Sequence, residues 1–517
     1  MKNSVRIMAA VFLVLLFGLS WKNHQLTKDA LREGIAKDGG LRSVVESVQT
    51  AYQGSDFYKK NDFINISGGF ARVMGRQVVN KTVRLGNGHL NPQNDAVPDW
   101  EQKAELVTEL HDWLEAQDIP MLYVQMPYKV DLQEELLPVG LENGVNEANT
   151  QLVNRLREAS VQVLDLREYL SADGAQVTEN FYVTDHHWTP VAAFRGFQYI
   201  AEAVQELFTE KEVLGWEVLD ENQWELHAKE NGFLGSRGRR VGQWYVGMDD
   251  LLWLEPKFET SMSTAVPVYQ RFDSGSYVDA VIQEEYLGDV SGIVVDGKPG
   301  TYFNTNQFCV YIGGDYPQVV HRNADAPVDM RVLIIKDSFM LPCQTFLATL
   351  FTHVETLDVR YAEDPRIAES IIKSDPDLVI YAQSVGKPVD NYAESFSELG
   401  NMQQVFQGDL QLQIPEGSTE GYRMALDGRA GTFYECAYEA AVGMAENCGL
   451  YFALVDRASG RVLDACIADP VRASREVQRL RIPIGFEGEV DLMIYPDMPM
   501  YERGGSVLLK NLSIKKS

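Results

Sequence analysis

The sequence predicts an α/β fold with a mainly parallel sheet, followed by a C-terminal domain made of β-strands. Between residues 99 and 381, short apolar runs alternate with amphipathic segments. The connections between them are short, which favours parallel strands covered by helices on both faces. From about residue 395, short alternating strands separated by Gly, Asp and Pro follow without a helix signal. This second pattern is typical of a β-sandwich.

The elements of the α/β part follow one another along the chain. Asp99–Gln117 is expected to be a helix because apolar residues such as Leu106, Leu110 and Leu114 recur at helical spacing. Pro190 suits a first helical position, so a helix should run from there to about Phe208. The remaining elements are expected as strands at Ile119–Val124, Val161–Leu166, Arg331–Lys336, Val354–Val359 and Leu378–Tyr381, and as helices at Asn146–Ala159, Leu341–Phe351 and Pro365–Lys373.

An insert from about residue 215 to 326 differs in composition and is rich in Trp, Tyr and Gly. Asp296-Gly297 predicts a hairpin turn within it. The insert also holds Arg237, Arg239 and Arg240 in an otherwise acidic chain. These cations suit either an anionic substrate or a carboxylate of the protein itself.

The C-terminal region, residues 396–517, is expected to form an independent β-sandwich that resembles carbohydrate-binding modules. Such a module would hold the protein on a polymer rather than perform chemistry. Its strands are expected at Leu410–Ile414, Gly449–Val455, Val462–Ala465, Val477–Ile484, Glu489–Tyr495 and Ser506–Ile514.

The charge balance limits the classes of partner. The chain has 46 Lys and Arg against 74 Asp and Glu, a formal net charge of −28. This argues against nucleic acid, whose binding needs clustered cations, and it disfavours docking on an anionic membrane face. The five cysteines are too few for a disulfide scaffold, although Cys436 and Cys448 could form a bridge in an oxidising compartment. Their spacing does not fit a zinc site, so no metal and no cofactor are predicted.

The N-terminus carries a targeting signal. Lys2 and Arg6 precede an uncharged run from Ile7 to Trp21, which Lys22 ends. Fifteen residues lie between the flanking charges, which is short for a free-standing membrane span and typical of a signal-peptide core. We therefore expect a signal anchor over residues 1–25, with the rest of the chain extracytoplasmic, either tethered to the membrane or secreted. A buried N-terminal helix is the alternative.

Three residues have the chemistry of a covalent acyl-transfer site. Asp185 and His187 lie two positions apart, so one turn can place a carboxylate behind an imidazole. Ser338 follows the apolar run Val332–Ile335, at an expected strand-to-helix turn. In such a triad the imidazole accepts the serine proton and the carboxylate orients the imidazole.

The site also needs hydrogen-bond donors for the oxyanion that develops during acyl transfer. The backbone N–H near Ser338, at the expected helix start, is one candidate. Arg360 and Gln383 follow strand ends on the same edge of the sheet, where ligands of such folds bind. Tyr361 and Arg237 complete the candidate oxyanion or substrate residues.

The motif Thr184-Asp185-His186-His187-Trp188-Thr189-Pro190 resembles the signature of bacterial DHHW-motif proteins, which are similar to the SGNH-hydrolase-like alginate O-acetyltransferases. The resemblance covers roughly residues 95–395, and Ile334–Phe339 matches the strand-Asp-Ser-aromatic element of the family. It implies an SGNH-hydrolase-like domain over residues 26–395, with Asp185 as orienting acid, His187 as base and Ser338 as nucleophile. Gln383 stands where ordinary SGNH enzymes carry an asparagine.

Other interpretations of the same residues remain open. Asp185, His186 and His187 could hold a metal, with His321 or His353 as a further ligand. Asp185 could also cap the helix that begins near Pro190. Trp188 and Tyr182 are more often packing residues than substrate platforms.

The resemblance implies an exported enzyme that O-acetylates a cell-surface or secreted polysaccharide. The expected partners are a polysaccharide or oligosaccharide acceptor and a membrane-bound O-acyltransferase that supplies the acyl group. A carbohydrate acetyl esterase with the same triad is the first alternative. A non-catalytic envelope protein that binds glycans is the second.

Overall fold

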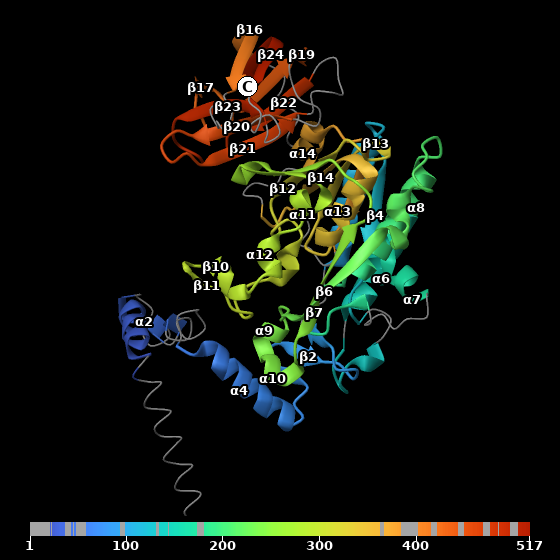
Figure 1. Cartoon of the computed structure of the whole chain (residues 1–517), viewed down its shortest axis with the longest axis vertical. Coiled ribbons are helices and arrows are strands. Elements are labelled where there is room, and N and C mark those ends of the chain that lie inside the picture. The colour runs from blue at the N-terminus through green and yellow to red at the C-terminus, as the bar shows by residue number, and fades with distance from the viewer. Residues whose placement is uncertain are drawn as a thin grey trace, which may run out of the picture.

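The computed structural model describes a long molecule with the C-terminal strands at one end and helices α4 and α10 at the other (Figure 1). The described residues are 21, 23–36, 43–44, 46–47, 58–93, 99–130, 134–142, 144–172, 180–361, 367–383, 402–414, 421–442, 449–468, 476–483, 485–496 and 505–516. Most of the expected signal anchor, residues 1–20, lies outside them. Within these ranges, every helix is too short or too polar to cross a membrane.

The core of the α/β part is one eight-stranded sheet in the order β5-β4-β15-β13-β14-β12-β8-β9. The first five strands are parallel to one another, and they are the five that the sequence predicts. The bounds of these parallel strands are β4 Met121–Gln125, β5 Gln162–Asp165, β13 Val328–Lys336, β14 Phe351–Leu357 and β15 Leu378–Ala382.

The insert completes the same sheet. Its strands β8 (Met262–Val266), β9 (Arg271–Gly275) and β12 (Gln318–Asn323) pair antiparallel and extend the sheet beyond β14. Asp296 and Gly297 both have positive φ, 51° and 72°, and form the predicted hairpin turn between β10 (Val294–Val295) and β11 (Lys298–Pro299). The insert is therefore part of the domain that carries the parallel sheet.

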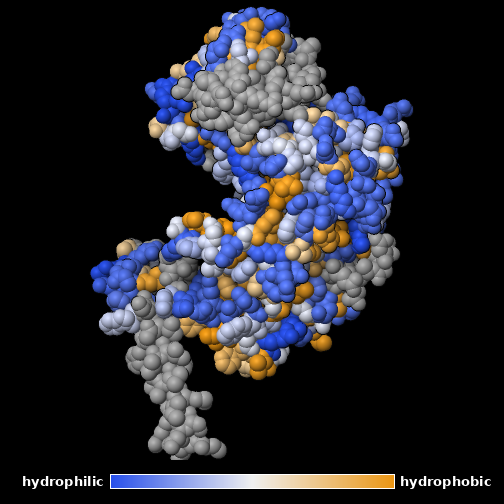
Figure 2. Space-filling model, viewed as in Figure 1, coloured by the Kyte–Doolittle hydropathy of each residue, from blue (hydrophilic) through white to orange (hydrophobic). Residues whose placement is uncertain are grey.

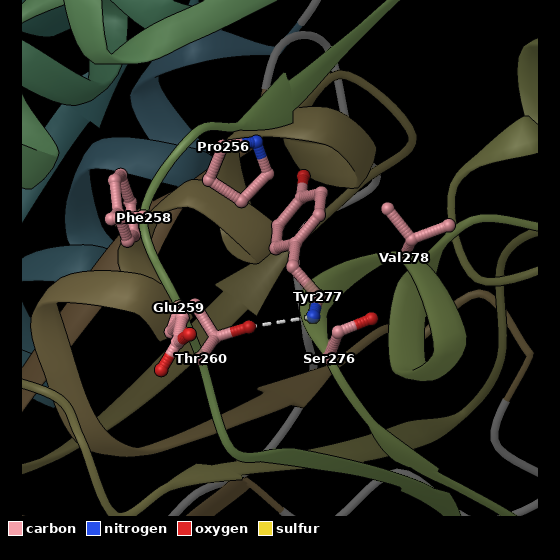
Figure 3. Close-up of a pocket in the computed structure, with 7 residues that line it drawn as sticks. All are labelled: Pro256, Phe258, Glu259, Thr260, Ser276, Tyr277 and Val278. Atoms are coloured by element: carbon pink, nitrogen blue, oxygen red, sulfur yellow. Dashed lines mark hydrogen bonds between the residues drawn. The ribbon is translucent and has the colours of Figure 1, made fainter.

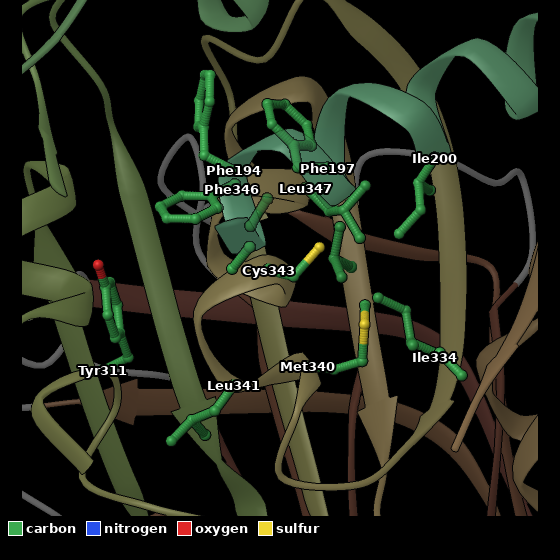
Figure 4. Close-up of a cluster of buried hydrophobic side chains, with 14 of the residues drawn as sticks. Phe194, Phe197, Ile200, Tyr311, Ile334, Met340, Leu341, Cys343, Phe346 and Leu347 are labelled. Atoms are coloured by element: carbon green, nitrogen blue, oxygen red, sulfur yellow. The ribbon is translucent and has the colours of Figure 1, made fainter. Parts of the chain in front are cut away.

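Helices cover both faces of the parallel half, as predicted. Along β13, Val332 and Ile334 pack against α8 (Pro190–Leu207) and α13 (Met340–Leu350), whereas Leu333 and Ile335 pack on the opposite face. Figure 4 shows side chains of α8 and α13 directed toward one another above the sheet. The opposite face is covered by α5 (Trp100–Glu115), α6 (Gly144–Glu158) and α14 (Ile367–Ser374). Alternate residues of a central strand are thus buried on both sides, which explains the continuous apolar run.

The lower end of the molecule in Figure 1 is built from short elements. Helix α4 (Lys60–Val73) packs against α9 (Gly238–Val241) and α10 (Gln243–Val246). Further elements of the α/β part, not all at this end, are helices α2 His24–Ala36, α7 Leu166–Ala172, α11 Tyr277–Val281 and α12 Glu284–Leu287, a small sheet of β1 Val78–Val79, β2 Thr82–Arg84 and β3 Leu90–Pro92, and the long hairpin β6 Trp224–Phe233 and β7 Asp249–Pro256.

The C-terminal region forms two antiparallel sheets around one apolar core, in agreement with the predicted β-sandwich. Three of its strands, β17 to β19, were not expected from the sequence. One sheet has the order β16-β24-β18-β22 with β19 beside β24, and the other has the order β17-β23-β20-β21. The strands are β16 Gln403–Ile414, β17 Tyr422–Leu426, β18 Phe433–Tyr438, β19 Ala440–Val442, β20 Leu450–Asp456, β21 Val462–Ala468, β22 Glu476–Arg481, β23 Val490–Pro496 and β24 Gly505–Lys516. Cys436 is a free, buried thiol, and Cys448 lies outside the described residues.

The second sheet of the sandwich packs against the α/β domain, because its strand β20 is buried on both faces. Phe452 and Leu454 point into the sandwich core. Between them, Ala453 packs with Ala265 and Val320 of the eight-stranded sheet. Lys373 of α14 also forms an ion pair of 2.7 Å with Asp464 of β21. The sandwich and the α/β domain therefore share an apolar interface with a partly buried ion pair at its margin, a feature that strand periodicity alone cannot reveal.

Candidate active site

The structure brings Asp185, His187 and Ser338 together. Ser338 lies just after β13 and before α13, at the carboxyl edge of the parallel strands. Its Oγ is 2.8 Å from His187 Nε2. On the other side of the ring, His187 Nδ1 is 2.6 Å from Asp185 Oδ1, and the same oxygen accepts the His187 backbone N–H at 2.9 Å. The order carboxylate, imidazole, hydroxyl is the arrangement of a serine-based acyl-transfer site.

A closed turn fixes Asp185 and His187. The segment returns on itself because the Tyr182 N–H donates to the His187 carbonyl at 3.2 Å and the Thr189 N–H donates to the Asn180 carbonyl at 2.9 Å. Thr189, not Asp185, caps helix α8, since its side chain accepts the Ala192 N–H. The alternative role of Asp185 as a helix cap is therefore wrong, and its carboxylate is left for the imidazole.

The insert encloses the Asp185 carboxylate. The backbone N–H of Ser236 donates a short hydrogen bond to Oδ2. A Cβ on Gly235 would lie 2.4 Å from the Asp185 Cβ, so only glycine allows this approach. Burial raises the pKa of Asp185, but its contacts with His186 and His187 prevail and hold the pKa well below the usual value. The ionised carboxylate requires a proton on Nδ1 of His187, which leaves Nε2 free to accept from Ser338.

Two residues that sequence reasoning missed, Lys129 and Asp249, hold this turn in place through hydrogen bonds of their side chains. The fully buried ammonium of Lys129 donates to the carbonyl oxygens of Leu90 at 2.9 Å, of Tyr182 at 2.5 Å and of Asp185 at a shorter distance. Burial lowers the pKa of Lys129 to about 7, against the opposing charges of Asp185 and Asp249. Neither residue lies near the motif in sequence, so no spacing rule points to them.

Asp249, at the start of β7, fixes the first half of the turn. Its carboxylate accepts the backbone N–H groups of Val183 and Thr184, both at 2.8 Å, and the Thr184 hydroxyl at 2.6 Å. The Thr184 hydroxyl in turn accepts the Gly235 N–H at 2.8 Å. The turn is therefore held to the insert by side chains as well as by its own backbone.

Aromatic rings fix the imidazole of His187. Phe308 stacks on it with ring centroids 4.1 Å apart and an angle of 9° between the planes. Phe339, the residue after the serine, contacts it from another side at 5.1 Å. Trp188 is fully buried and donates its indole N–H to the Phe339 carbonyl at 2.7 Å. Trp188 and the buried Tyr182 are thus packing residues, and Phe308 is a contact that sequence reasoning missed.

His186 lies beside the triad. Its Nδ1 is 2.8 Å from the Ser236 hydroxyl and 3.2 Å from Asp185 Oδ1. Burial and the neighbouring His187 lower the pKa of His186 to about 4, which makes this ring neutral near pH 7.

The geometry also bears on the metal alternative. Asp185, His186 and His187 offer ligand atoms within 4.8 Å of one another. His321 instead bonds to Thr264 at 2.9 Å, and His353 lies 3.9 Å from Glu355, so in the described part of the chain neither extends this group. A metal there would have to displace the contact of one His187 ring nitrogen, either that of Nδ1 with Asp185 or that of Nε2 with Ser338.

The predicted oxyanion residues have other partners. Arg360 forms a bidentate ion pair with the buried Asp358, at 2.8 and 2.6 Å, and stacks over the exposed ring of Tyr361. The side-chain oxygen of Gln383 accepts the Tyr381 hydroxyl at 2.9 Å. The backbone N–H of Ser338, in contrast, makes no hydrogen bond within the described ranges. It is the donor best placed to meet an oxyanion formed at its own side chain.

The arginine-rich segment of the insert adjoins the same turn. The backbone N–H of Arg237 donates to the Thr184 carbonyl at 3.1 Å, and its Nε–H reaches the Ser236 hydroxyl at 3.4 Å. Arg239 donates to the Thr305 carbonyl at 2.6 Å. Across the described residues, neither guanidinium has a carboxylate within 4.0 Å. Among the described residues, Arg237 and Arg239 thus form no ion pair with a carboxylate, although the charge of the Asp185 carboxylate acts on both.

A pocket elsewhere on the surface is separate from this site. Figure 3 shows it between the end of β7 and the start of α11, where the Tyr277 N–H donates to the Thr260 hydroxyl at 2.6 Å. None of its lining residues belongs to the triad or to the turn. They are Pro256, Phe258, Glu259, Thr260, Ser276, Tyr277 and Val278.

Comparisons with known proteins found one family model and several solved structures that are similar to this chain. Residues 87–234 match the family described as SGNH hydrolase-like domain, acetyltransferase AlgX. Among solved structures, Bacillus cereus PatB1 with a sulfonyl adduct is 19% identical, with 60% of this chain and 96% of that chain covered and a TM-score of 0.47. A DHHW family protein from Eubacterium siraeum is 19% identical, with coverages of 60% and 94% and a TM-score of 0.42. Pseudomonas aeruginosa AlgX is 12% identical, with coverages of 84% and 93% and a TM-score of 0.35.

No match was found among curated proteins. Structural similarity at this level does not by itself assign an activity. The family match includes the Asp185 motif and confirms the resemblance that the sequence indicated. The chain therefore contains an SGNH hydrolase-like domain, and its similarity to an acetyltransferase family over residues 87–234 supports an enzyme of the acyl-transfer or hydrolase class.

Proposed function

We propose that this protein is an exported, membrane-tethered O-acetyltransferase that modifies a cell-surface or secreted polysaccharide through an acyl-enzyme on Ser338. The observation that carries the proposal is the line of contacts from Asp185 through His187 to Ser338, of which Asp185 and His187 lie within the residues that match an acetyltransferase family. A non-catalytic glycan-binding protein would have no need to keep these three groups in contact at 2.6 and 2.8 Å.

The first half of the reaction acylates the enzyme. Ser338 Oγ attacks the carbonyl carbon of the acetyl donor while its proton passes to Nε2 of His187. The tetrahedral oxyanion accepts the backbone N–H of Ser338. When this intermediate collapses, the bond to the donor group breaks, and His187 returns the proton to the leaving oxygen. Asp185 remains ionised and stabilises the imidazolium throughout.

The second half transfers the acetyl group. A hydroxyl of the polysaccharide gives its proton to His187 and attacks the acetyl-serine, and collapse of the second intermediate regenerates the Ser338 hydroxyl. If water takes the place of the sugar hydroxyl, the same steps make the protein a carbohydrate acetyl esterase, which is the alternative function. In the transferase reaction, a membrane-bound O-acyltransferase would supply the acetyl donor.

The experiment that separates the alternatives is incubation of the purified protein with an acetyl ester donor, with and without oligosaccharide acceptors. The transferase predicts acetylated oligosaccharides, detected by mass spectrometry, at the expense of free acetate. Acetate alone in the presence of every acceptor would favour the esterase. The Ser338→Ala variant is the control and should give neither product.

A further inference from the structure

One face of helix α4 is apolar and exposed to solvent. Three apolar residues follow Ile66 at helical spacing, namely Phe70 four positions later, Val73 seven and Met74 eight. This spacing places all four on one side of the helix. The exposed fractions of Phe70 and Val73 are 67% and 86%. Figure 2 shows this apolar surface at the lower end of the molecule, over α4. The other side of the helix is buried at Gly68 and Ala71, so the apolar side chains of this face are directed toward solvent.

A tryptophan extends the stripe. Trp244 of α10 is 63% exposed and lies beside α4, because a Cβ on Gly69 would be 3.4 Å from the Trp244 Cβ. Exposed Trp beside Phe and Val is the side-chain set of a helix that lies in a membrane interface, where the indole ring is favoured.

The local charge is opposite to that of the chain as a whole. Residues 58–84 hold six Lys and Arg and one Asp, a net charge of +5 in a chain of −28. The stripe is flanked by four exposed cations, which are Arg72, Arg76, Lys81 and Arg240. The global balance, which disfavours an anionic membrane face, therefore does not describe this end of the molecule. Clustered cations around an apolar stripe complement the anionic headgroups of a bilayer.

The stripe is rigidly attached to the α/β domain. A Cβ on Gly68 would lie 1.8 Å from the carbonyl oxygen of Val241, so the backbones of α4 and α9 touch. Asn65 accepts the Gln243 N–H at 2.8 Å, and the Tyr245 hydroxyl donates to the Arg76 carbonyl at 2.6 Å. Helix α4 is thus a fixed part of the surface.

We propose that the face formed by Ile66, Phe70, Val73, Met74 and Trp244, hereafter the α4 face, lies in the interfacial layer of an anionic phospholipid bilayer. The sequence adds a second reason for this occupant. The uncharged run from Ile7 to Trp21 precedes α4 by fewer than 40 residues, so an anchored chain would hold α4 near the membrane surface. The proposal does not depend on the acyl-transfer function.

The test must separate the α4 face from the N-terminal apolar run, which would bind vesicles by itself. We therefore suggest the full chain with p-benzoylphenylalanine in place of Phe70, irradiated with vesicles of phosphatidylethanolamine and phosphatidylglycerol. The control carries the same group in place of Tyr269, which is 62% exposed and lies near the sandwich, since Tyr451 donates to the carbonyl of the neighbouring Pro267. The N-terminal run is present in both proteins.

The proposal predicts phospholipid adducts at position 70 in roughly tenfold excess over position 269, because only one of the two sites would be immersed. Arg76→Glu combined with Lys81→Glu should lower the adduct yield roughly tenfold or more, whereas Lys257→Glu, at a distant exposed position, should not. Vesicles of phosphatidylcholine alone should give the same loss as the double variant.

Equal lipid adducts at positions 70 and 269 would overturn the proposal. Adducts of position 70 with another protein in native membranes, without lipid adducts, would overturn it in favour of a protein partner. Hydrolysis of a soluble acetyl ester by each variant checks that the fold is intact. If the chain without any substitution does not hydrolyse the ester, that result counts against the proposed function and not against the α4 face.

Discussion

Gly235 approaches Asp185 so closely that a Cβ on the glycine would lie 2.4 Å from the Cβ of the aspartate and 2.6 Å from its Oδ2. The insert thereby sets the position of the carboxylate that orients His187. We predict that Gly235→Ala lowers the rate of acyl transfer by about a hundredfold, because a displaced carboxylate misaligns the imidazole. The measurement is kcat with a soluble acetyl ester. Gly292→Ala, where a Cβ meets no atom within 4 Å, is the control and should leave the rate unchanged.

The triad predicts an order of effects. Ser338→Ala and His187→Ala should each lower kcat by about 10⁴-fold or more, because each removes a group that forms or breaks bonds, and Ser338→Ala should leave the melting temperature unchanged. Asp185→Ala should retain more activity, and His186→Ala the most, since His186 contacts the carboxylate but not the serine. If His186→Ala were as damaging as His187→Ala while Ser338→Ala kept turnover, a metal site would explain the two histidines better.

Lys129 should support both the turn and a pH dependence of stability. Lys129→Met leaves three buried carbonyl oxygens without this donor, so we expect a loss of acyl transfer of tenfold or more. The folded-state pKa is about 7 and the ordinary value is 10.5, so between these pH values the unfolded chain binds more protons than the folded chain.

The contribution of Lys129 to the free energy of unfolding therefore rises with pH. Between pH 7 and pH 9, the difference between the native protein and Lys129→Met should grow by about 2 kcal/mol in favour of the native protein. Urea unfolding at the two pH values measures it. A constant difference would mean that the Lys129 pKa is not lowered.

The interface between the sandwich and the eight-stranded sheet should be essential for stability. Ala453→Asp would place a carboxylate among Ala265 and Val320, so we expect the free energy of unfolding to fall by about 3 kcal/mol or more. Ala458→Asp, in the exposed turn after the same strand, is the control and should cost less than about 0.5 kcal/mol. Equal effects in denaturant unfolding would show that the apolar interface is not formed in solution.

The parallel half of the sheet could be predicted because each of its strands is a short run of apolar residues between turn signals. The insert was harder to place. Strands β8, β9 and β12 join the same sheet through pairings such as Val320 with Glu355, and no local pattern encodes a partner so distant in sequence. Strand β17 escaped prediction because it is a half-exposed edge strand, and β18 because Glu435 and Ala437 interrupt its β-forming residues.

The candidate site likewise divides into residues that the sequence predicts and residues that it does not. Asp185, His187 and Ser338 could be predicted because their residue types and order form a motif. Lys129, Asp249 and Phe308 could not, because each acts from a different element on the backbone or ring of a motif residue. The Gly235-Ser236 pair, just after an apolar strand end, is the signal in the sequence of a close backbone approach.

The place of β15 in the sheet has a consequence for how the chain folds. Strands β5 and β4 join β13 and β14 only through β15, whose Val379 pairs with Met121 some 258 residues earlier. During synthesis, the open edge of β4 must therefore wait until the last parallel strand has emerged. Such a high contact order predicts slow, late closure and a need for protection of that edge by chaperones. Until β15 is inserted, the chain cannot complete the sheet whose edge carries Ser338.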